Sequence, residues 1–200
     1  KSGIPSLAEP CDVSTVPADF QYEAYPYPRW IKADCLHGRN LMETMQFLFP
    51  HFLPPSLPPY PLQVLIAGCG TGAHAIEVDT RYKDIDVLAI DLSYNSLSYA
   101  IRKAKELKVS QLVFKHGDIL KLASAKLYFL IECLGVLHGL QNPQEAIHRL
   151  VSCLYPGGLL KLGLVRTKAR QKVLNCRTWF KNSGFQTTQQ GLRQARQAIF

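Results

Sequence analysis

A glycine-rich stretch follows a short apolar run in the first half of the chain. Residues 64–67 read Val-Leu-Ile-Ala, too short for a helix but long enough for a buried parallel strand. Residues 68–72 read Gly-Cys-Gly-Thr-Gly, and glycine suits a turn that needs positive φ and close approach of a ligand. A helix beginning near Ala73 would point its unbonded N–H groups at this turn. The stretch predicts a nucleotide-type site, and a core strand followed by a flexible loop is the alternative.

Two acidic residues follow the next two apolar runs. Asp91 ends the run at 86–90, about 20 residues beyond the glycine turn, where a carboxylate can accept both hydroxyls of an adenosine ribose. Asp118 follows the run at 112–114 and is placed to accept from an adenine amino group. A solvent-exposed acid at a strand end is the alternative for Asp91, and a turn-forming acid that caps a loop is the alternative for Asp118.

The glycine turn also satisfies a dinucleotide pattern. Residues 68–73 match G-x-G-x-x-A, so an NAD-binding oxidoreductase fragment is one hypothesis. The remainder of the 200 residues offers no nicotinamide or substrate domain. A compact G-x-G-x-G turn with acids after the second and third strands fits a ligand with one adenosine and no phosphates better.

Strand and helix patterns alternate beyond residue 62. A helix is clearly bounded by Asn142 at its N-cap, Pro143 at its first position and Glu145 at the capping-box position, with Pro156 ending it. This alternation predicts an α/β fold, a doubly wound, Rossmann-like and mostly parallel sheet with ligands at the carboxyl ends of its strands. The predicted strands are 63–67, 86–90, 112–114, 127–131 and 159–165, and the other predicted helices are about 73–82 and 95–107.

The two ends of the chain differ from this pattern. Residues 20–30 are rich in proline and aromatic residues, which predicts an extended arm that packs on the rest of the protein. Residues 41–49 have helical spacing, ended by Pro50. Beyond about residue 166 only helical patterns remain, so we expect a sheet truncated after its fifth strand, with Leu162 and Leu164 partly exposed and a marginally stable or poorly soluble protein.

Charge and cysteine usage limit the partners. Up to Glu145 there are 13 Lys and Arg against 15 Asp and Glu, and beyond it ten Lys and Arg with no acid. A basic tail suits nucleic acid, membrane phosphate or an acidic segment absent from the sequence, and the truncated sheet favours the last of these.

The six cysteines lack C-x-x-C spacing, which favours free thiols in a reducing cytoplasm and no metal site. No apolar run reaches the roughly 18 residues of a membrane span, and the first residues indicate a cut or processed end.

Several motifs together resemble a known family. The stretches 65–72, 87–93, 117–120, 135–138 and 156–158 are similar to motifs of class I S-adenosylmethionine-dependent methyltransferases. More narrowly, Tyr22-Glu23 and the Pro-Tyr-Pro-Arg-Trp run at 26–30, with the stretches 102–104 and 161–164, resemble bacterial methyltransferase domains that follow tetratricopeptide repeats. The resemblance extends over about residues 20–200. It implies S-adenosylmethionine as cofactor, an unidentified methyl acceptor and a tetratricopeptide-repeat segment in the full-length chain. Nucleic acid is not the expected partner because acidic residues further along could balance the basic tail, and the lack of a long apolar run predicts no membrane partner.

The resemblance also implies roles for individual residues. The three glycines would pass beneath the methionine part and the ribose, Asp91 would hold the ribose hydroxyls and Asp118 the adenine, and Leu92 and Ile119 would sandwich the adenine ring. Residues 1–61 would form an arm and helix that cover the site, and 62–200 a cofactor-binding domain with an incomplete C-terminal part. The expected cofactor-binding residues are Gly68, Cys69, Gly70, Thr71, Gly72, Asp91, Leu92, Asp118 and Ile119.

The catalytic residues are less defined by the sequence. Methyl transfer is an in-line displacement, so a protein mainly positions the reactants, and a base matters only if the acceptor must lose a proton. His138 and Glu132 are the candidates, with backbone bonding within a loop as the alternative for His138. The family usually has a second histidine where this chain has Gly139, Phe-Asp in place of Tyr128-Phe129, and Asn in place of Tyr25. A non-catalytic module that binds S-adenosylmethionine is therefore the second hypothesis.

Overall fold

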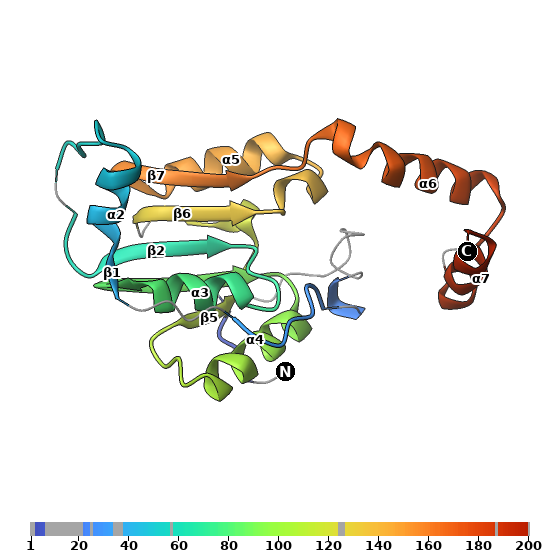
Figure 1. The fold of residues 1–200 in the computed structure, drawn as a ribbon, viewed down its shortest axis with the longest axis horizontal. Coiled ribbons are helices and arrows are strands. Elements are labelled where there is room, and N and C mark those ends of the chain that lie inside the picture. The colour runs from blue at the N-terminus through green and yellow to red at the C-terminus, as the bar shows by residue number, and fades with distance from the viewer. Residues whose placement is uncertain are drawn as a thin grey trace. The chain divides into compact units, whose positions relative to one another are not determined.

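The protein is described by a computed structural model that divides into two compact units, Lys1–Leu164 and Val165–Phe200. Each unit is described by itself (Figure 1). The residues that the structure describes are 3–6, 22–24, 26–33, 38–56, 58–123, 127–186 and 188–199.

The first unit contains a five-stranded sheet in which all paired strands run parallel. The first of these strands along the chain is central, with the next two on one side of it and the last two on the other, so the fold is doubly wound, as predicted (Figure 1). The direction of winding changes between β2 and β6. In spatial order the strands are β5 (Val113–His116), β4 (Ile85–Asp91), β2 (Leu62–Ala67), β6 (Tyr128–Leu134) and β7 (Leu154–Gly163).

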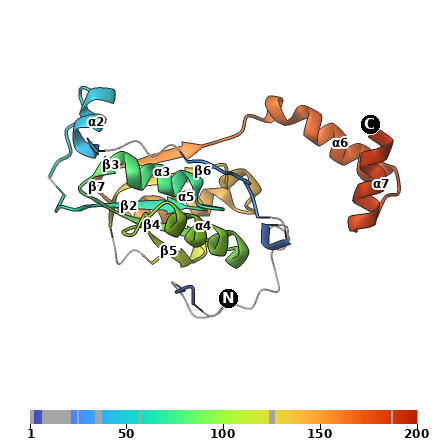
Figure 2. The same ribbon diagram turned by 60° about the horizontal axis from the view of Figure 1, so that its bottom comes forward.

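Helices cover both faces of this sheet. Side chains of α3 (Ala73–Arg81) and α4 (Tyr94–Glu106) pack on one face, where Ile76 and Leu97 are fully buried. On the other face α5 (Pro143–Ser152) packs through Ala146 and Leu150 (Figures 1 and 2). The alternation of buried residues along β2 between the two clusters explains why its apolar run is continuous.

Local capping signals determine where these helices begin. Glu145 N donates to Asn142 Oδ1 at 3.2 Å, and Asn142 Nδ2 donates back to Glu145 Oε2 at 3.2 Å, which confirms the predicted start of α5. At α4, Ser93 Oγ accepts from Ser96 N.

The segment before the sheet packs beside it. Helix α2 (Leu41–Leu48) is capped by Asn40, whose Oδ1 accepts from Glu43 N, and buries Leu41, as its spacing predicted. Short strands β1 (Arg39–Asn40) and β3 (Tyr82–Lys83) pair in parallel next to it.

The end of α5 and the start of β7 differ from the prediction. The helix ends at Ser152, and β7 already includes Pro156, which was expected to end the helix. Proline fits there because β7 is an edge strand and its register with β6 shifts between Tyr128 and Leu130. Gly158 lies so close to β6 that a Cβ atom on it would come within 2.9 Å of Phe129 O. The other predicted boundaries differ from the observed ones by only a few residues.

The two edge strands of the sheet are β7 and β5. Within the described ranges β7 has β6 as its sole strand neighbour, and Leu164 is 65% exposed, which agrees with the predicted five strands and partly exposed apolar residues. At the opposite edge His116 N donates to Pro5 O at 2.9 Å, and Ser6 forms a parallel bridge with His116. The predicted poor solubility stays a prediction.

The second unit is helical and basic. It contains η3 (Thr167–Arg170), α6 (Gln171–Asn182) and α7 (Gln189–Ile199), and its part of the sequence has no acidic residue. The Phe185 ring packs near Trp179 and Phe180, at centroid distances of 5.7 and 5.9 Å. No helix among the described residues of either unit is long and apolar enough to span a bilayer.

Candidate functional site

The glycine turn connects the central strand to α3 in a conformation that favours glycine. Gly68, Gly70 and Gly72 have φ values of 77°, 54° and 84°. The N–H groups of Gly68 and Cys69 both donate to Ile90 O at 2.9 Å, so the turn is bonded to the end of β4. A Cβ atom on Gly68 would overlap a methyl group of Val136, and one on Gly72 would lie 2.5 Å from Ala100 Cβ. The turn therefore has no room for side chains at these two positions.

Asp91 lies against the turn, as the sequence predicted. Its Oδ2 accepts from Gly70 N at 2.8 Å, and its Oδ1 accepts from Ser93 N at 2.9 Å. Burial raises the pKa of the Asp91 carboxyl, and the two N–H groups and the nearby His116 oppose this rise. Each carboxylate oxygen has a second lone-pair direction, so the group can accept hydroxyl donors as well. Cys69 beside it is buried, and burial and Asp91 raise the pKa of its thiol well above the usual range.

The residues expected around adenine follow β4 and β5. His116 Nε2 donates to Leu92 O at 3.0 Å, and the His116 ring stacks on Tyr94 at a centroid distance of 4.0 Å. Asp118 Oδ1 accepts from Leu120 N at 2.9 Å and caps η1 (Ile119–Lys121). The capping role that was the alternative for Asp118 is thus present. Ile119 is only 6% exposed and packs in the core, so it offers little surface to a ligand.

The proline-rich arm crosses the glycine turn. Trp30 Nε1 donates to Thr71 O at 3.0 Å, and Thr71 Oγ1 donates to Pro28 O at 2.5 Å. Tyr27 O lies 2.7 Å from the position that a Cβ atom on Gly70 would take. The sequence predicted that the arm packs on something, and the described part of it packs on this turn. Tyr25, another residue of the predicted arm, lies outside the described residues.

The same arm is bonded to α4 in two places. Tyr99 OH donates to Trp30 O at 2.6 Å, and the two rings meet edge to face. Glu23 Oε2 accepts from Asn95 N and from Ser93 Oγ, both at 3.0 Å, at the N-terminus of the helix. A carboxylate is favoured there because it meets the positive end of the helix dipole. These partners were not predicted, although Glu23 stood within the motif that carried the narrower resemblance.

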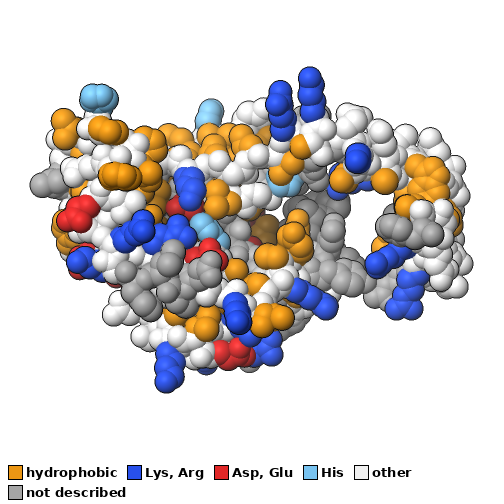
Figure 3. All heavy atoms as spheres, in the orientation of Figure 1, with side chains coloured by type: hydrophobic (Ala, Val, Ile, Leu, Met, Phe, Trp, Pro, Cys, Tyr) orange, Lys and Arg blue, Asp and Glu red, His pale blue; other side chains and the backbone are white. Residues whose placement is uncertain are grey.

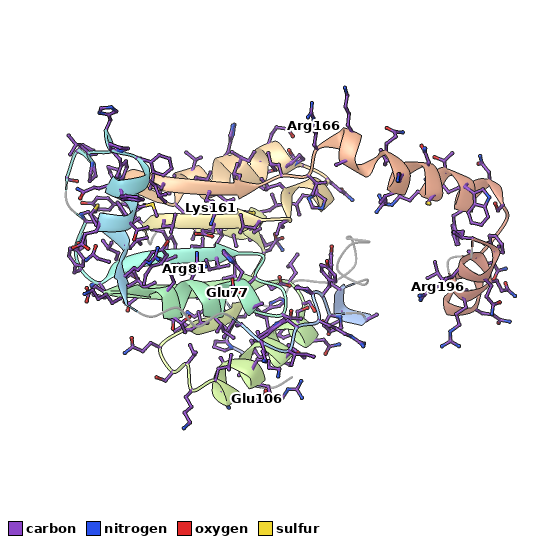
Figure 4. The ribbon with its side chains drawn as sticks, in the orientation of Figure 1. Glu77, Arg81, Glu106, Lys161, Arg166 and Arg196 are labelled. Carbon is purple, nitrogen blue, oxygen red and sulfur yellow. The ribbon has the colours of Figure 1, made fainter. Side chains whose placement is uncertain are left out.

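A charged cluster lies at the carboxyl half of β6. Glu132 is 4% exposed, and its Oε2 contacts His74 Nε2 at 2.5 Å and Lys161 Nζ at 3.1 Å. Burial opposes ionisation of Glu132, but the hydrogen bonds and charges of His74 and Lys161 outweigh it and lower its pKa. Basic, acidic and histidine side chains gather near the middle of the face drawn in Figure 3, and Figure 4 labels Lys161. His138, the other catalytic candidate, is exposed in η2 (Leu137–Gly139).

The lowered pKa of Glu132 predicts a pH effect on stability. A carboxyl group with a lowered folded-state pKa stabilises the fold above its ordinary pKa of about 4.3, and this stabilisation is lost as the pH falls through the folded-state value. We expect the unfolding free energy of the wild type to fall more steeply than that of Glu132→Gln below about pH 4.3. Urea unfolding of both proteins across this range measures the difference, and parallel pH curves would contradict the assignment.

No cation site accompanies this arrangement in the described ranges, where no three His, Cys, Asp or Glu side chains are placed to hold a metal ion. The cysteines that the structure describes are free: Cys69, Cys133 and Cys153 are buried, and Cys176 is exposed.

A parallel sheet with a glycine turn after its central strand, and with acids at the ends of the next two strands along the chain, β4 and β5, is the architecture of class I S-adenosylmethionine-dependent methyltransferases. Residues 64–158, slightly less than half of the chain, match the family described as "Methyltransferase domain". The match includes the glycine turn, Asp91, Asp118 and Glu132.

Curated relatives and solved structures agree with this assignment. Ubiquinone biosynthesis O-methyltransferase of Rickettsia felis is 31% identical over 115 residues, which are 56% of this chain and 45% of that protein. Malonyl-[acyl-carrier protein] O-methyltransferase of Halalkalibacterium halodurans is 35% identical over 104 residues, 50% of this chain and 38% of that protein. The chain spans less than half the length of these curated relatives.

Among solved structures, N-methyltransferase NodS from Bradyrhizobium japonicum in complex with S-adenosylhomocysteine is similar with a TM-score of 0.50 and 26% identity, over 67% of each chain. PKMT2 from Rickettsia typhi in complex with the same ligand gives a TM-score of 0.59 at 21% identity, over 87% of this chain and 34% of that one. The second likeness concerns the fold alone.

Proposed function

We propose that this chain binds S-adenosylmethionine over the turn at 68–72 and transfers its methyl group to an acceptor. The observation that carries the proposal is the double anchoring of Asp91, which bonds the glycine turn through Gly70 N and the start of α4 through Ser93 N. This geometry presents a partly buried carboxylate beside the backbone of a glycine-rich turn. It suits a ligand with vicinal hydroxyls that lies flat on the turn.

The residues present fit the cofactor. The glycines allow the positive φ values of the turn and its close packing against Val136, Tyr27 O and Ala100. Asp91 retains lone pairs for two hydroxyl donors. Leu92, which is half-buried, would contact the adenine from the end of β4. Asp118 would accept from the adenine amino group with the lone pairs that its bond to Leu120 N leaves, in the role that the resemblance implies.

Methyl transfer requires the protein mainly to place the cofactor and the acceptor relative to each other. When bound, the sulfonium would supply a methyl group to a nucleophile placed in line with the carbon–sulfur bond, which would break as the new bond forms, its electrons passing to sulfur in the departing S-adenosylhomocysteine. The chain's residues would hold the two reactants and exclude water. The similar proteins include O- and N-methyltransferases by name, so the acceptor atom is open. For a hydroxyl acceptor, His138 in the loop after β6 is the candidate that would take the proton.

Calorimetry tests the cofactor. S-adenosylhomocysteine should bind the protein with micromolar or better affinity, and NAD should not bind measurably. Binding of NAD alone would overturn the proposal in favour of an oxidoreductase fragment. A second assay, conversion of S-adenosylmethionine in the presence of cell extract, separates an enzyme from a non-catalytic binding module. The cytoplasmic location and the tetratricopeptide-repeat segment stay predictions.

We further propose that residues 1–61 act as a cover over this site. Support comes from the contacts of Trp30 with Thr71 and of Pro28 with the same residue, which tie the arm to the backbone beneath the proposed ligand. A cover of this kind slows the escape of a bound ligand.

Replacing Trp30 tests the cover. Trp30→Ala removes one hydrogen bond and the ring packing on Tyr99, so S-adenosylhomocysteine should dissociate about 10-fold faster. Trp179→Ala in the second unit is the matched control and should leave the rate unchanged. Stopped-flow displacement measures the rates, and equal rates for Trp30→Ala and wild type would show a passive arm.

A further inference from the structure

The glycine turn is contacted at both of its ends by β6 and the loop that follows it. At the first end, Val136 packs against Gly68 so closely that no Cβ atom fits between them. At the second end, Glu132 bonds His74, the second residue of α3 and two residues beyond Gly72. The short segment 132–136 thus contacts the protein at both ends of the glycine turn.

The second contact involves three elements. His74 comes from α3, Glu132 from β6 and Lys161 from β7, and Glu132 and Lys161 are directly paired across the two strands. The side chain of Glu132 is 5% exposed, against 29% for His74 and 52% for Lys161. A buried carboxylate must be bonded to be tolerated, and here the same oxygen accepts from both neighbours. Its removal therefore takes away the polar contact between the first turn of α3 and the sheet, whereas the buried side chains of Ala75 and Ile76 stay packed.

We propose that Glu132 is a positioning residue which, through His74, holds the backbone from Gly72 to His74 against β6 and so fixes the shape of the cofactor site. The inference rests on the proposed function and deepens it. The proposal also distinguishes a positioning role of the Glu132 carboxylate from a role as general base. A general base would affect turnover and leave cofactor binding unchanged, whereas a positioning residue affects cofactor binding itself.

The geometry argues against the role of base. The hydrogen bonds of Glu132 to His74 and Lys161 are both with nitrogen groups on its own protein, and a carboxylate held by two such groups is a poor proton acceptor. Its lowered pKa agrees with this. The exposed His138 is the better candidate for a base.

The main experiment measures S-adenosylhomocysteine affinity by calorimetry for Glu132→Gln and His74→Gln. Each should weaken binding about 10-fold, as expected for the loss of one charge-assisted bond that orders a site. The double variant should lose little more than either single one, because both changes break the same contact. Glu106→Gln, which breaks an exposed contact of 2.7 Å with Lys103 on α4, is the matched control and should bind as the wild type does (Figure 4).

Three further variants separate the loss of this contact from a general loss of stability. Lys161→Arg keeps the charge and should bind as wild type does, whereas Lys161→Met should weaken binding. Leu150→Ala, in the core on the opposite face, should lower the melting temperature with no change in affinity at a temperature where it is folded. Wild-type affinity in folded Glu132→Gln would overturn the proposal. If that variant does not fold, wild-type affinity in His74→Gln overturns it instead.

A ligand-free measurement separates this proposal from the proposed function. Amide hydrogen exchange at Gly72 and Ile76, whose N–H groups donate to Cys69 O and Gly72 O, should become at least about 10-fold faster in Glu132→Gln, with exchange in α4 unchanged. Faster exchange in Glu132→Gln supports the positioning role whether or not the wild type binds S-adenosylhomocysteine. Failure of the wild type to bind S-adenosylhomocysteine would count against the proposed function and not against the positioning role. Unchanged exchange at Gly72 and Ile76 would overturn the positioning role.

Discussion

Replacing Asp91 by alanine should weaken S-adenosylhomocysteine binding by about 2–4 kcal/mol, or roughly 30- to 1000-fold. Two effects add. The variant loses the acceptor proposed for the ribose hydroxyls, and it also leaves Gly70 N and Ser93 N without their carboxylate partner, which loosens the turn. Asp91→Asn should retain part of the affinity because its amide oxygen still accepts one of these bonds. Calorimetric titration of the folded variants gives the values.

Asp86 provides the control for this prediction. It lies on the same strand, is exposed, and accepts from Gln63 Nε2 at 2.9 Å at the other end of β4. Asp86→Ala should leave the affinity unchanged. An Asp91→Ala protein that is folded and binds as tightly as the wild type would remove Asp91 from the site.

Gly72→Ala should destabilise the fold by about 2–5 kcal/mol. The residue has a φ of 84°, which an alanine adopts only with strain, and its new Cβ atom would lie 2.5 Å from Ala100 Cβ and 3.3 Å from Phe114 Cε1. Since these groups belong to α4 and β5, the helix and the sheet would have to separate locally. Urea unfolding followed by circular dichroism measures the loss.

Gly38→Ala isolates the packing part of that loss. Gly38 has a similar φ of 81°, but no atom lies within 4 Å of the position that an added methyl group would take, so its replacement costs only the backbone strain of about 1–2 kcal/mol. The difference between the two variants is the cost of overpacking. Equal losses would show that α4 moves freely away from the turn.

The parts of the fold that local patterns specify were predicted well. The apolar run before 68–72 and the Asn142–Glu145 signal each depend on neighbouring residues, so the sequence alone predicts the strand and the helix start. The boundary at Pro156 was wrong because an edge strand with a register shift tolerates proline, and edge position is a property of the whole sheet.

The parts of the site that depend on distant residues could not be predicted. Trp30 and Thr71 are 41 residues apart, and His74 and Glu132 are 58 apart, so no local spacing links them. Asp118 shows a different difficulty. A short acidic side chain after a strand suits both a ligand and a cap, and the structure shows the cap without excluding the ligand.

The close fit of Val136 on Gly68 limits how this region can vary in length. Segments after the strands of such sheets usually accept added residues, because most lie on the surface. Glu132 contacts His74 beyond one end of the glycine turn, and Val136 contacts Gly68 at the other end. A residue added or deleted between Glu132 and Val136 would therefore move one of these two contacts out of place. Insertions are therefore better tolerated after Gly139, where the chain has left the turn, than within these five residues.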